Sequence, residues 1–147
     1  MDAFTAEVIR SSVVAITDEM KTNLMRTAYN MIIYEAEDFT VGLFDADGNT
    51  ISIGLGLPMF IRGLSDAIKA KLAHWGKENI HPGDILLTND PQVMGSHLNH
   101  MIFTLPIFHD GELIAFLFVD GPLAGRRRRA RHGDAGYFFR RACRCRS

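Results

Sequence analysis

The stretch that decides how this chain is interpreted is Asn89-Asp90-Pro91-Gln92-Val93-Met94-Gly95-Ser96-His97-Leu98-Asn99-His100. An apolar run, residues 85–88, leads into it, and a longer one, residues 101–108, leads out. A polar segment between two apolar runs predicts a loop held by two strands, and binding and catalytic groups concentrate on such loops. We therefore expect the functional residues to lie here.

Four side chains of this loop are candidates for the chemistry. His97 and His100 are three positions apart, close enough for both imidazoles to reach one metal ion. The carboxylate of Asp90 and the carboxamide of Asn89 complete the polar set. The same residues also fit a plain turn, because Asp-Pro with a nearby Gly is ordinary turn chemistry, and loop histidines are often solvated. The spacing alone leaves both interpretations open.

Further motifs follow the same order along the chain as in a known family. They are Phe4–Arg10, Glu37-Asp38-Phe39, Leu43-Phe44-Asp45-Ala46-Asp47-Gly48, Pro82-Gly83-Asp84 and Asp110-Gly111-Glu112-Leu113. Together with Asn89-Asp90-Pro91 and Gly95-Ser96-His97-Leu98-Asn99, they resemble the hydantoinase B/oxoprolinase family over about residues 3–118. That family includes N-methylhydantoinase B subunits, the C-terminal half of 5-oxoprolinases and the large subunits of acetone carboxylase-like enzymes.

The resemblance implies an enzyme that depends on ATP and on a second subunit. The partner would be of the hydantoinase A type, whose actin-like fold binds the ATP, so the enzyme would be a hetero-oligomer. The expected reaction is hydrolysis of a cyclic amide such as 5-oxoproline or a hydantoin, and the runner-up is carboxylation of a ketone. Family members are several times longer, so we expect this chain to be an N-terminal fragment that is inactive alone.

The resemblance also implies a divalent metal. In the carboxylase branch the large subunit holds it through a His-x-x-Asp pair and a later His. His97 matches the first ligand, whereas His100 stands where Asp is usual, which keeps a ligand but removes a negative charge and leaves Mn, Zn or Fe open. Asn89 and Asp90 are the implied catalytic residues, with Asp90 a further ligand, a partner that orients His97, or a turn residue.

Charge is divided sharply between the body of the chain and its C-terminal tail. Residues 1–125 carry 7 Lys and Arg against 16 Asp and Glu, whereas residues 126–147 carry 9 Arg against Asp134 alone. A basic tail on an acidic body suggests a competing class, a non-catalytic binding protein with nucleic acid as its partner. The tail has neither helical periodicity nor interleaved aromatic residues, so we expect no nucleic-acid partner.

The tail also has the composition of a gene read out of frame. Residues 121–128, Gly-Pro-Leu-Ala-Gly-Arg-Arg-Arg, can be encoded by bases that read Ala-His-Trp-Leu-Asp-Val-Gly-Gly when shifted by one position. That reading resembles what the family carries after this hairpin, and its His would be the third metal ligand. We therefore predict a family domain over residues 1–120 and an out-of-frame or disordered tail over residues 121–147.

Composition predicts a globular protein of the cytoplasm. Hydrophobic residues make up 47% of the chain and charged residues 22%, as in soluble domains. No apolar run approaches the ~20 residues that a bilayer span requires. The opening, Met1–Glu7, lacks the basic region and apolar core of a signal peptide.

Hydrophobic periodicity predicts an α+β fold, with two amphipathic helices packed on a mainly antiparallel sheet. One helix is expected from the N-terminus to about residues 31–38, and another over residues 60–75 with Lys69 and Lys71 facing outward. The near-continuous apolar character of the strands predicts a sheet covered on both faces. The expected strands are residues 39–44, 50–53, 85–88, 101–108 and 113–119, with hairpin turns at Asp47-Gly48-Asn49 and Asp110-Gly111.

Overall fold

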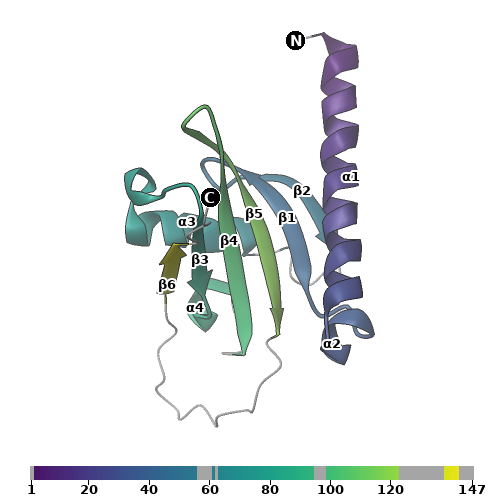
Figure 1. Cartoon of the computed structure of the whole chain (residues 1–147), viewed down its shortest axis with the longest axis vertical. Coiled ribbons are helices and arrows are strands. Elements are labelled where there is room, and N and C mark those ends of the chain that lie inside the picture. The colour runs from purple at the N-terminus through teal and green to yellow at the C-terminus, as the bar shows by residue number, and fades with distance from the viewer. Residues whose placement is uncertain (1, 56–60, 62, 95–98, 123–137, 143–147) are drawn as a thin grey trace, which may run out of the picture.

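A computed structural model shows the chain as one sheet with helices packed against it (Figure 1). It describes residues 2–55, 61, 63–94, 99–122 and 138–142. The sheet has the order β2-β1-β5-β4-β3-β6, and each neighbouring pair is antiparallel. The predicted α+β class is therefore confirmed. The elements are α1 (Ala3–Thr27), α2 (Met31–Tyr34), β1 (Thr40–Asp45), β2 (Thr50–Leu55), α3 (Leu64–Trp75), the 3₁₀ helix η2 (Lys77–Asn79), β3 (Asp84–Thr88), α4 (Pro91–Met94), β4 (His100–His109), β5 (Glu112–Pro122) and β6 (Phe138–Ala142).

Part of the predicted tail belongs to the sheet, because residues 138–142 pair with β3 as the edge strand β6. The rest of the tail, residues 123–137 and 143–147, lies outside the described residues, as does His97. The prediction of an out-of-frame or disordered tail stays a prediction. Within the described part of the chain, no helix is long and apolar enough to cross a membrane.

Both predicted hairpin turns are confirmed. In the first, the Asp45 carboxylate accepts hydrogen bonds from the backbone N–H groups of Asp47 (2.9 Å) and Asn49 (2.8 Å). In the second, Asp110 has φ 49° and Gly111 has φ 84°. Left-handed backbone at both central residues is what a two-residue hairpin turn requires.

The first helix is shorter than predicted. Asp2 caps its start by accepting a hydrogen bond from the Thr5 N–H (2.7 Å). The helix ends at Thr27 because Ala28 is extended, and Asn30 then caps the separate short helix α2. Thr17 is the buried residue of α1, and its hydroxyl lies 2.9 Å from that of Ser52 on β2. The N-terminal turns of α1 project past the sheet (Figure 1).

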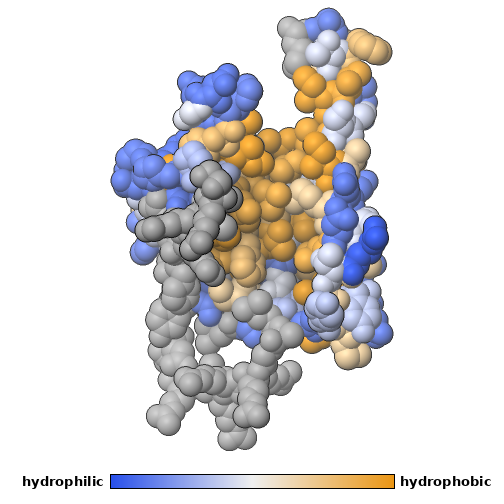
Figure 2. Space-filling view, in the orientation of Figure 1, coloured by the Kyte–Doolittle hydropathy of each residue, from blue (hydrophilic) through white to orange (hydrophobic). Residues whose placement is uncertain are grey.

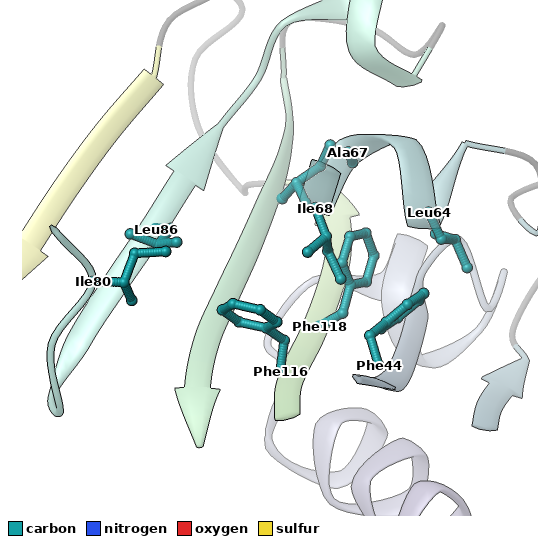
Figure 3. Close-up of a cluster of buried hydrophobic side chains, with 9 residues drawn as sticks. Phe44, Leu64, Ala67, Ile68, Ile80, Leu86, Phe116 and Phe118 are labelled. Carbon is teal, nitrogen blue, oxygen red and sulfur yellow. The ribbon is translucent and has the colours of Figure 1, made fainter. Parts of the chain in front are cut away.

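The hydrophobic core lies between α3 and one face of the sheet, which we call the covered face. Phe44 of β1 and Phe116 and Phe118 of β5 are fully buried and point toward Leu64 and Ile68 of α3 (Figure 3). The rings of Phe44 and Phe118 lie 5.5 Å apart, centre to centre, in a tilted arrangement that aromatic pairs favour. This core fixes α3 across β1, β5 and β4.

Lys71 corrects the sequence prediction, because it faces the core rather than solvent. Its side chain is fully buried, and its Nζ donates to the backbone carbonyls of Leu86 (3.2 Å) and Ile102 (2.9 Å) and to Thr104 Oγ1 (2.7 Å). An ammonium has three protons to donate, so each has an acceptor. Lys69, two residues earlier, is exposed as predicted.

The opposite face, which we call the open face, is covered only in part. This corrects the prediction of a sheet covered on both faces. Helix α1 covers it over β1 and β2, where Val41 and Leu43 are buried and Gly54 passes so close to Thr17 that a Cβ atom would lie 2.7 Å from the Thr17 carbonyl oxygen. Over β4 and β5 the apolar side chains of this face are only half-buried, and Figure 2 shows them as a continuous apolar surface. They include Met101, Phe103, Leu105, Ile107, Leu117 and Val119.

Candidate functional site

The ends of three neighbouring strands bring polar side chains together at one end of the sheet. In the strand register, Asp120 of β5 lies opposite both Thr40 of β1 and Ile102 of β4. His100 begins β4 two residues before Ile102, and Asp38 precedes β1 by two residues. Antiparallel pairing therefore places Asp38, His100 and Asp120 near one another although they are distant in sequence.

These three side chains form a buried cluster around the imidazole of His100. Its Nδ1 lies 3.3 Å from Asp120 Oδ1, and its Nε2 lies 3.4 Å from Asp38 Oδ2. The side chain of His100 is 4% exposed, that of Asp120 is fully buried and that of Asp38 is 26% exposed. Both ring nitrogens therefore face a carboxylate, and Asp38 is the member nearest to solvent.

The two carboxylates favour positive charge at His100. Burial alone would lower the pKa of the imidazole, but the hydrogen bond and charge of Asp120 and the charge of Asp38 outweigh it, so the pKa of His100 is raised. A proton on the ring or a bound cation would supply that positive charge.

Two buried oxygens near this cluster have no hydrogen-bond partner among the residues that the structure describes. They are Asp120 Oδ2 and Thr40 Oγ1, which belong to directly opposed residues of β5 and β1. A buried carboxylate oxygen without a donor is uncommon in proteins. Lys71 adds a second charge to this part of the core: burial lowers its pKa well below the usual value, and the charge of Asp120 opposes that shift.

The structure gives Asp90 the hydrogen bonds of a turn residue. Its Oδ1 accepts from the Gln92 N–H (2.9 Å), its own N–H donates to Thr88 Oγ1 (3.2 Å), and its carbonyl accepts from the Val93 N–H (3.1 Å). These bonds turn the chain from β3 into α4. Asn89 is half-buried at the end of β3.

His97 falls in residues 95–98, outside the described part of the chain, so its pairing with His100 stays a prediction. Among the residues that the structure describes, no group of three His, Cys, Asp or Glu side chains could hold a metal ion. The described residues contribute a pair of possible donors, Asp38 Oδ2 and His100 Nε2.

Sequence reasoning missed both partners of His100 and the inward position of Lys71. Two of these three have a periodic signal: Asp120 follows Phe116 and Phe118 at the two-residue step of a strand, so it shares their buried face. Lys71 follows Ala67 by four residues, so it lies on the apolar stripe of α3. Nothing comparable marks Asp38 except its place in the Glu37-Asp38-Phe39 motif.

Comparison with known proteins identifies the chain. The family model described as Hydantoinase B/oxoprolinase matches residues 2–124. The chain belongs to the hydantoinase B/oxoprolinase family. It is 33% identical over 117 residues to 5-oxoprolinase 1 of Arabidopsis thaliana, covering 76% of this chain and 9% of that protein. It is 31% identical over 123 residues to caprolactamase subunit beta of Pseudomonas jessenii, covering 84% of this chain and 21% of that subunit.

Solved structures of family members have the same fold. The ATP-dependent caprolactamase of Pseudomonas jessenii matches with a TM-score of 0.76 and 30% identity, over 84% of this chain and 21% of that one. Nucleotide-free acetone carboxylase matches with a TM-score of 0.71, over 80% of this chain and 16% of that one, but at 21% identity it shows the fold alone. The chain thus spans about a tenth to a fifth of these relatives.

Proposed function

We propose that this chain is part of a subunit that hydrolyses a cyclic amide at the expense of ATP, together with an ATP-binding subunit of the hydantoinase A type. The observation that carries the proposal is the identity above 30% to two relatives named for cyclic amides, 5-oxoprolinase and caprolactamase. Caprolactamase is described as ATP-dependent, and its matching chain is one subunit of it. Ketone carboxylation remains the second candidate, supported by the fold of acetone carboxylase.

We also propose a divalent cation, Mn, Zn or Fe, at His100, with His97 as a second imidazole ligand. What supports such an ion is the contact between Asp120 and Nδ1 of His100, because a carboxylate commonly orients a metal-bound histidine in this way. When bound, the cation would polarise the carbonyl of the ring amide.

The chain's own residues would then orient the substrate and the ion. Asp120 would fix the ring plane and tautomer of His100. The hydrogen bonds of Asp90 within its turn support a positioning role for that residue, which sets where the loop leaves β3. The carboxamide of Asn89, beside it, would both donate to and accept from a ring amide.

A segment exchange tests the proposed reaction. Residues 2–124 of this chain would replace the matching segment of caprolactamase subunit beta, and the chimera would be assayed with its own ATP-binding partner on caprolactam, 5-oxoproline and hydantoin. We expect ring opening that depends on ATP, measured as ADP and open-chain product. His100→Ala should reduce the rate by roughly 100-fold, whereas His109→Ala, whose side chain is 75% exposed, should leave it unchanged.

Two outcomes would contradict the proposal. A chimera that assembles with the partner but consumes ATP only with a ketone and bicarbonate would favour the carboxylase alternative. A chimera that assembles but opens none of the three rings would refute the hydrolase role of this segment.

A further inference from the structure

We propose that Lys71 is a positioning residue for the proposed reaction: its amino group ties together the two strands that hold the ends of the candidate loop. That loop, residues 89–99, leaves β3 after Thr88 and returns to the sheet at His100, the first residue of β4. The inference rests on the proposed function and names a residue that holds its groups in place without touching the substrate.

The contacts of Lys71 cross the junction between β3 and β4. Its Nζ donates to the backbone carbonyl of Leu86 on β3 at 3.2 Å, and on β4 to the carbonyl of Ile102 at 2.9 Å and to Thr104 Oγ1 at 2.7 Å. In the strand register Leu86 is opposite Thr104. Ile102 is opposite Thr88, the last residue before the loop. One amino group therefore contacts two successive residue pairs of the junction, up to the pair at which the loop begins.

This junction is short compared with its neighbour. Strand β3 pairs with β4 over Leu86–Thr88, whereas β4 pairs with β5 over its full length, from His100 to His109. A short ladder opens locally more easily than a long one, so hydrogen bonds added by a side chain carry a larger share of its stability. The side chain of Lys71 is fully buried, which removes the competition from water that would weaken these bonds.

Helix α3 fixes the position from which Lys71 reaches the junction. Ala67 and Ile68, one turn earlier on the helix, are fully buried in the core (Figure 3). The stem of Lys71 is buried with them, so its amino group has little freedom to move away from the strands. The tie holds in either charge state. An ammonium donates to all three acceptors, whereas a neutral amine donates to the two carbonyls and accepts from the Thr104 hydroxyl.

The junction sets where the groups of the proposed site lie. At the end of β3, the Asp90 N–H donates to Thr88 Oγ1 (3.2 Å), which ties the start of the loop to the paired strand. Asn89 lies between these two residues, and His100 lies two residues before Ile102 on β4. A shift of β3 against β4 would therefore move Asn89 and Asp90 relative to His100.

Lys71 also interacts with the carboxylate that contacts His100. Burial lowers the pKa of Lys71 well below the usual value, and the charge of Asp120 opposes that shift. Asp120 is opposite Ile102 in the register of β4 with β5, and the Lys71 amino group contacts the carbonyl of Ile102. The tie therefore lies next to both the loop and the residue that contacts His100.

A simpler account gives Lys71 a role in the stability of the whole sheet alone. The two accounts differ in where the protein opens when the amino group is removed. Loss of general stability accelerates amide hydrogen exchange throughout the sheet. Loss of a positioning tie accelerates it at the β3–β4 junction and at the start of the loop.

The first test is amide hydrogen exchange of the whole 147-residue chain, followed by NMR. Lys71→Met keeps the apolar stem and removes the donors. We expect the amides of residues 85–88 and of Asp90 to exchange roughly 10-fold faster, relative to those of residues 41–44 on β1, than they do in the wild type.

The matched control is Ile68→Val, which shortens another buried side chain of α3. Ile68 lies beside Gly48, in the turn between β1 and β2, where an added Cβ would be 3.0 Å from it. This variant should leave the ratio between the two sets of amides unchanged. Thr104→Val removes one of the three acceptors and should raise the ratio by roughly 3-fold, so the test stands even if Lys71→Met does not fold.

A second test uses the chimera to separate positioning from loss of folded protein. A smaller folded fraction lowers the apparent kcat and leaves KM as it is, whereas displaced loop groups weaken substrate binding and raise KM. We expect Lys71→Met to raise KM for the ring that the chimera opens by roughly 10-fold, and Ile68→Val to leave it unchanged.

Equal acceleration of both sets of amides in Lys71→Met would overturn the inference, as would exchange at the junction that stays as slow as in the wild type. An unchanged KM would likewise reduce Lys71 to a residue of general stability. Because the exchange experiment contains neither ATP nor a cyclic amide, it decides the inference alone if the chimera opens no ring, and its failure is distinct from a failure of the proposed hydrolase function.

Discussion

The two faces of the sheet are made of similar strands but have opposite characters. The covered face is sealed by α3, yet it carries the polar groups: Lys71, Thr104, His100 and Asp120 are all buried there. The open face is almost wholly apolar, yet its β4 and β5 portion is only half-buried (Figure 2). Apolar content alone therefore does not tell which face of this sheet forms the core.

The two faces differ in which groups they bury, and this difference suits them to different roles. Polar groups can be buried on the covered face because most of them have hydrogen-bond partners there. The half-buried apolar side chains of the open face fit contact with further polypeptide, since a large apolar patch at the surface usually marks an interface. This agrees with relatives that are about five to eleven times as long as the segment they share with this chain.

Truncating one phenylalanine side chain on each face tests most directly whether the two faces differ in packing. Phe116→Ala removes a fully buried ring from the covered face and should lower the free energy of unfolding by about 3–5 kcal/mol. Phe103→Ala, on the half-buried open face, should cost about 1 kcal/mol. Urea denaturation of the two variants measures both. Equal losses would mean that the open face is as well packed as the covered one.

A second comparison concerns two lysines of α3. Lys71→Ala should lower the free energy of unfolding by about 2–3 kcal/mol, because it leaves Thr104 and two strand carbonyls without their ammonium donor. Lys71→Met keeps the apolar stem and should cost less. Lys69→Ala is the matched control, exposed on the same helix, and its melting temperature should stay close to that of the wild type. A neutral Lys71→Ala would contradict the inward position of this lysine.

The smallest expected effect concerns α1, which covers part of the open face. Thr17→Val removes one partner of the buried Thr17–Ser52 hydrogen bond and should cost about 1 kcal/mol. Ser52→Ala should cost a similar amount, and the double variant should cost less than the sum, since the two hydroxyls share one bond. Strictly additive losses in a double-mutant cycle would show that this bond does not join α1 to the sheet.

Local patterns predicted the elements of the fold well. Asp47-Gly48-Asn49 and Asp110-Gly111 gave both hairpins, because turn chemistry depends on neighbouring residues alone. The first helix was predicted to end later than it does. Its apolar spacing continues past Ala28, although the backbone there is extended. Periodicity does not register a break of that kind when the apolar residues on either side keep the same spacing.

The site was less predictable than the fold, because it depends on pairing between distant strands. His100 was a candidate from its loop, but its partners follow from the register of β5 with β1 and β4, which no local pattern encodes. Asp90 was a candidate for the same reason, and its hydrogen bonds are those of a turn. The role of His97 stays a prediction.

The register that brings Asp38 to His100 has a consequence for the order of folding. Strands β4 and β5 are joined by a two-residue turn, so their hairpin can close early and places His100 beside the end of β5. Strand β1 pairs with β5 only after a loop of some seventy residues has closed, which is entropically slow. Of the three members of the cluster, Asp38 depends on the pairing that is more distant in sequence, and the cluster is complete only when β1 has joined β5.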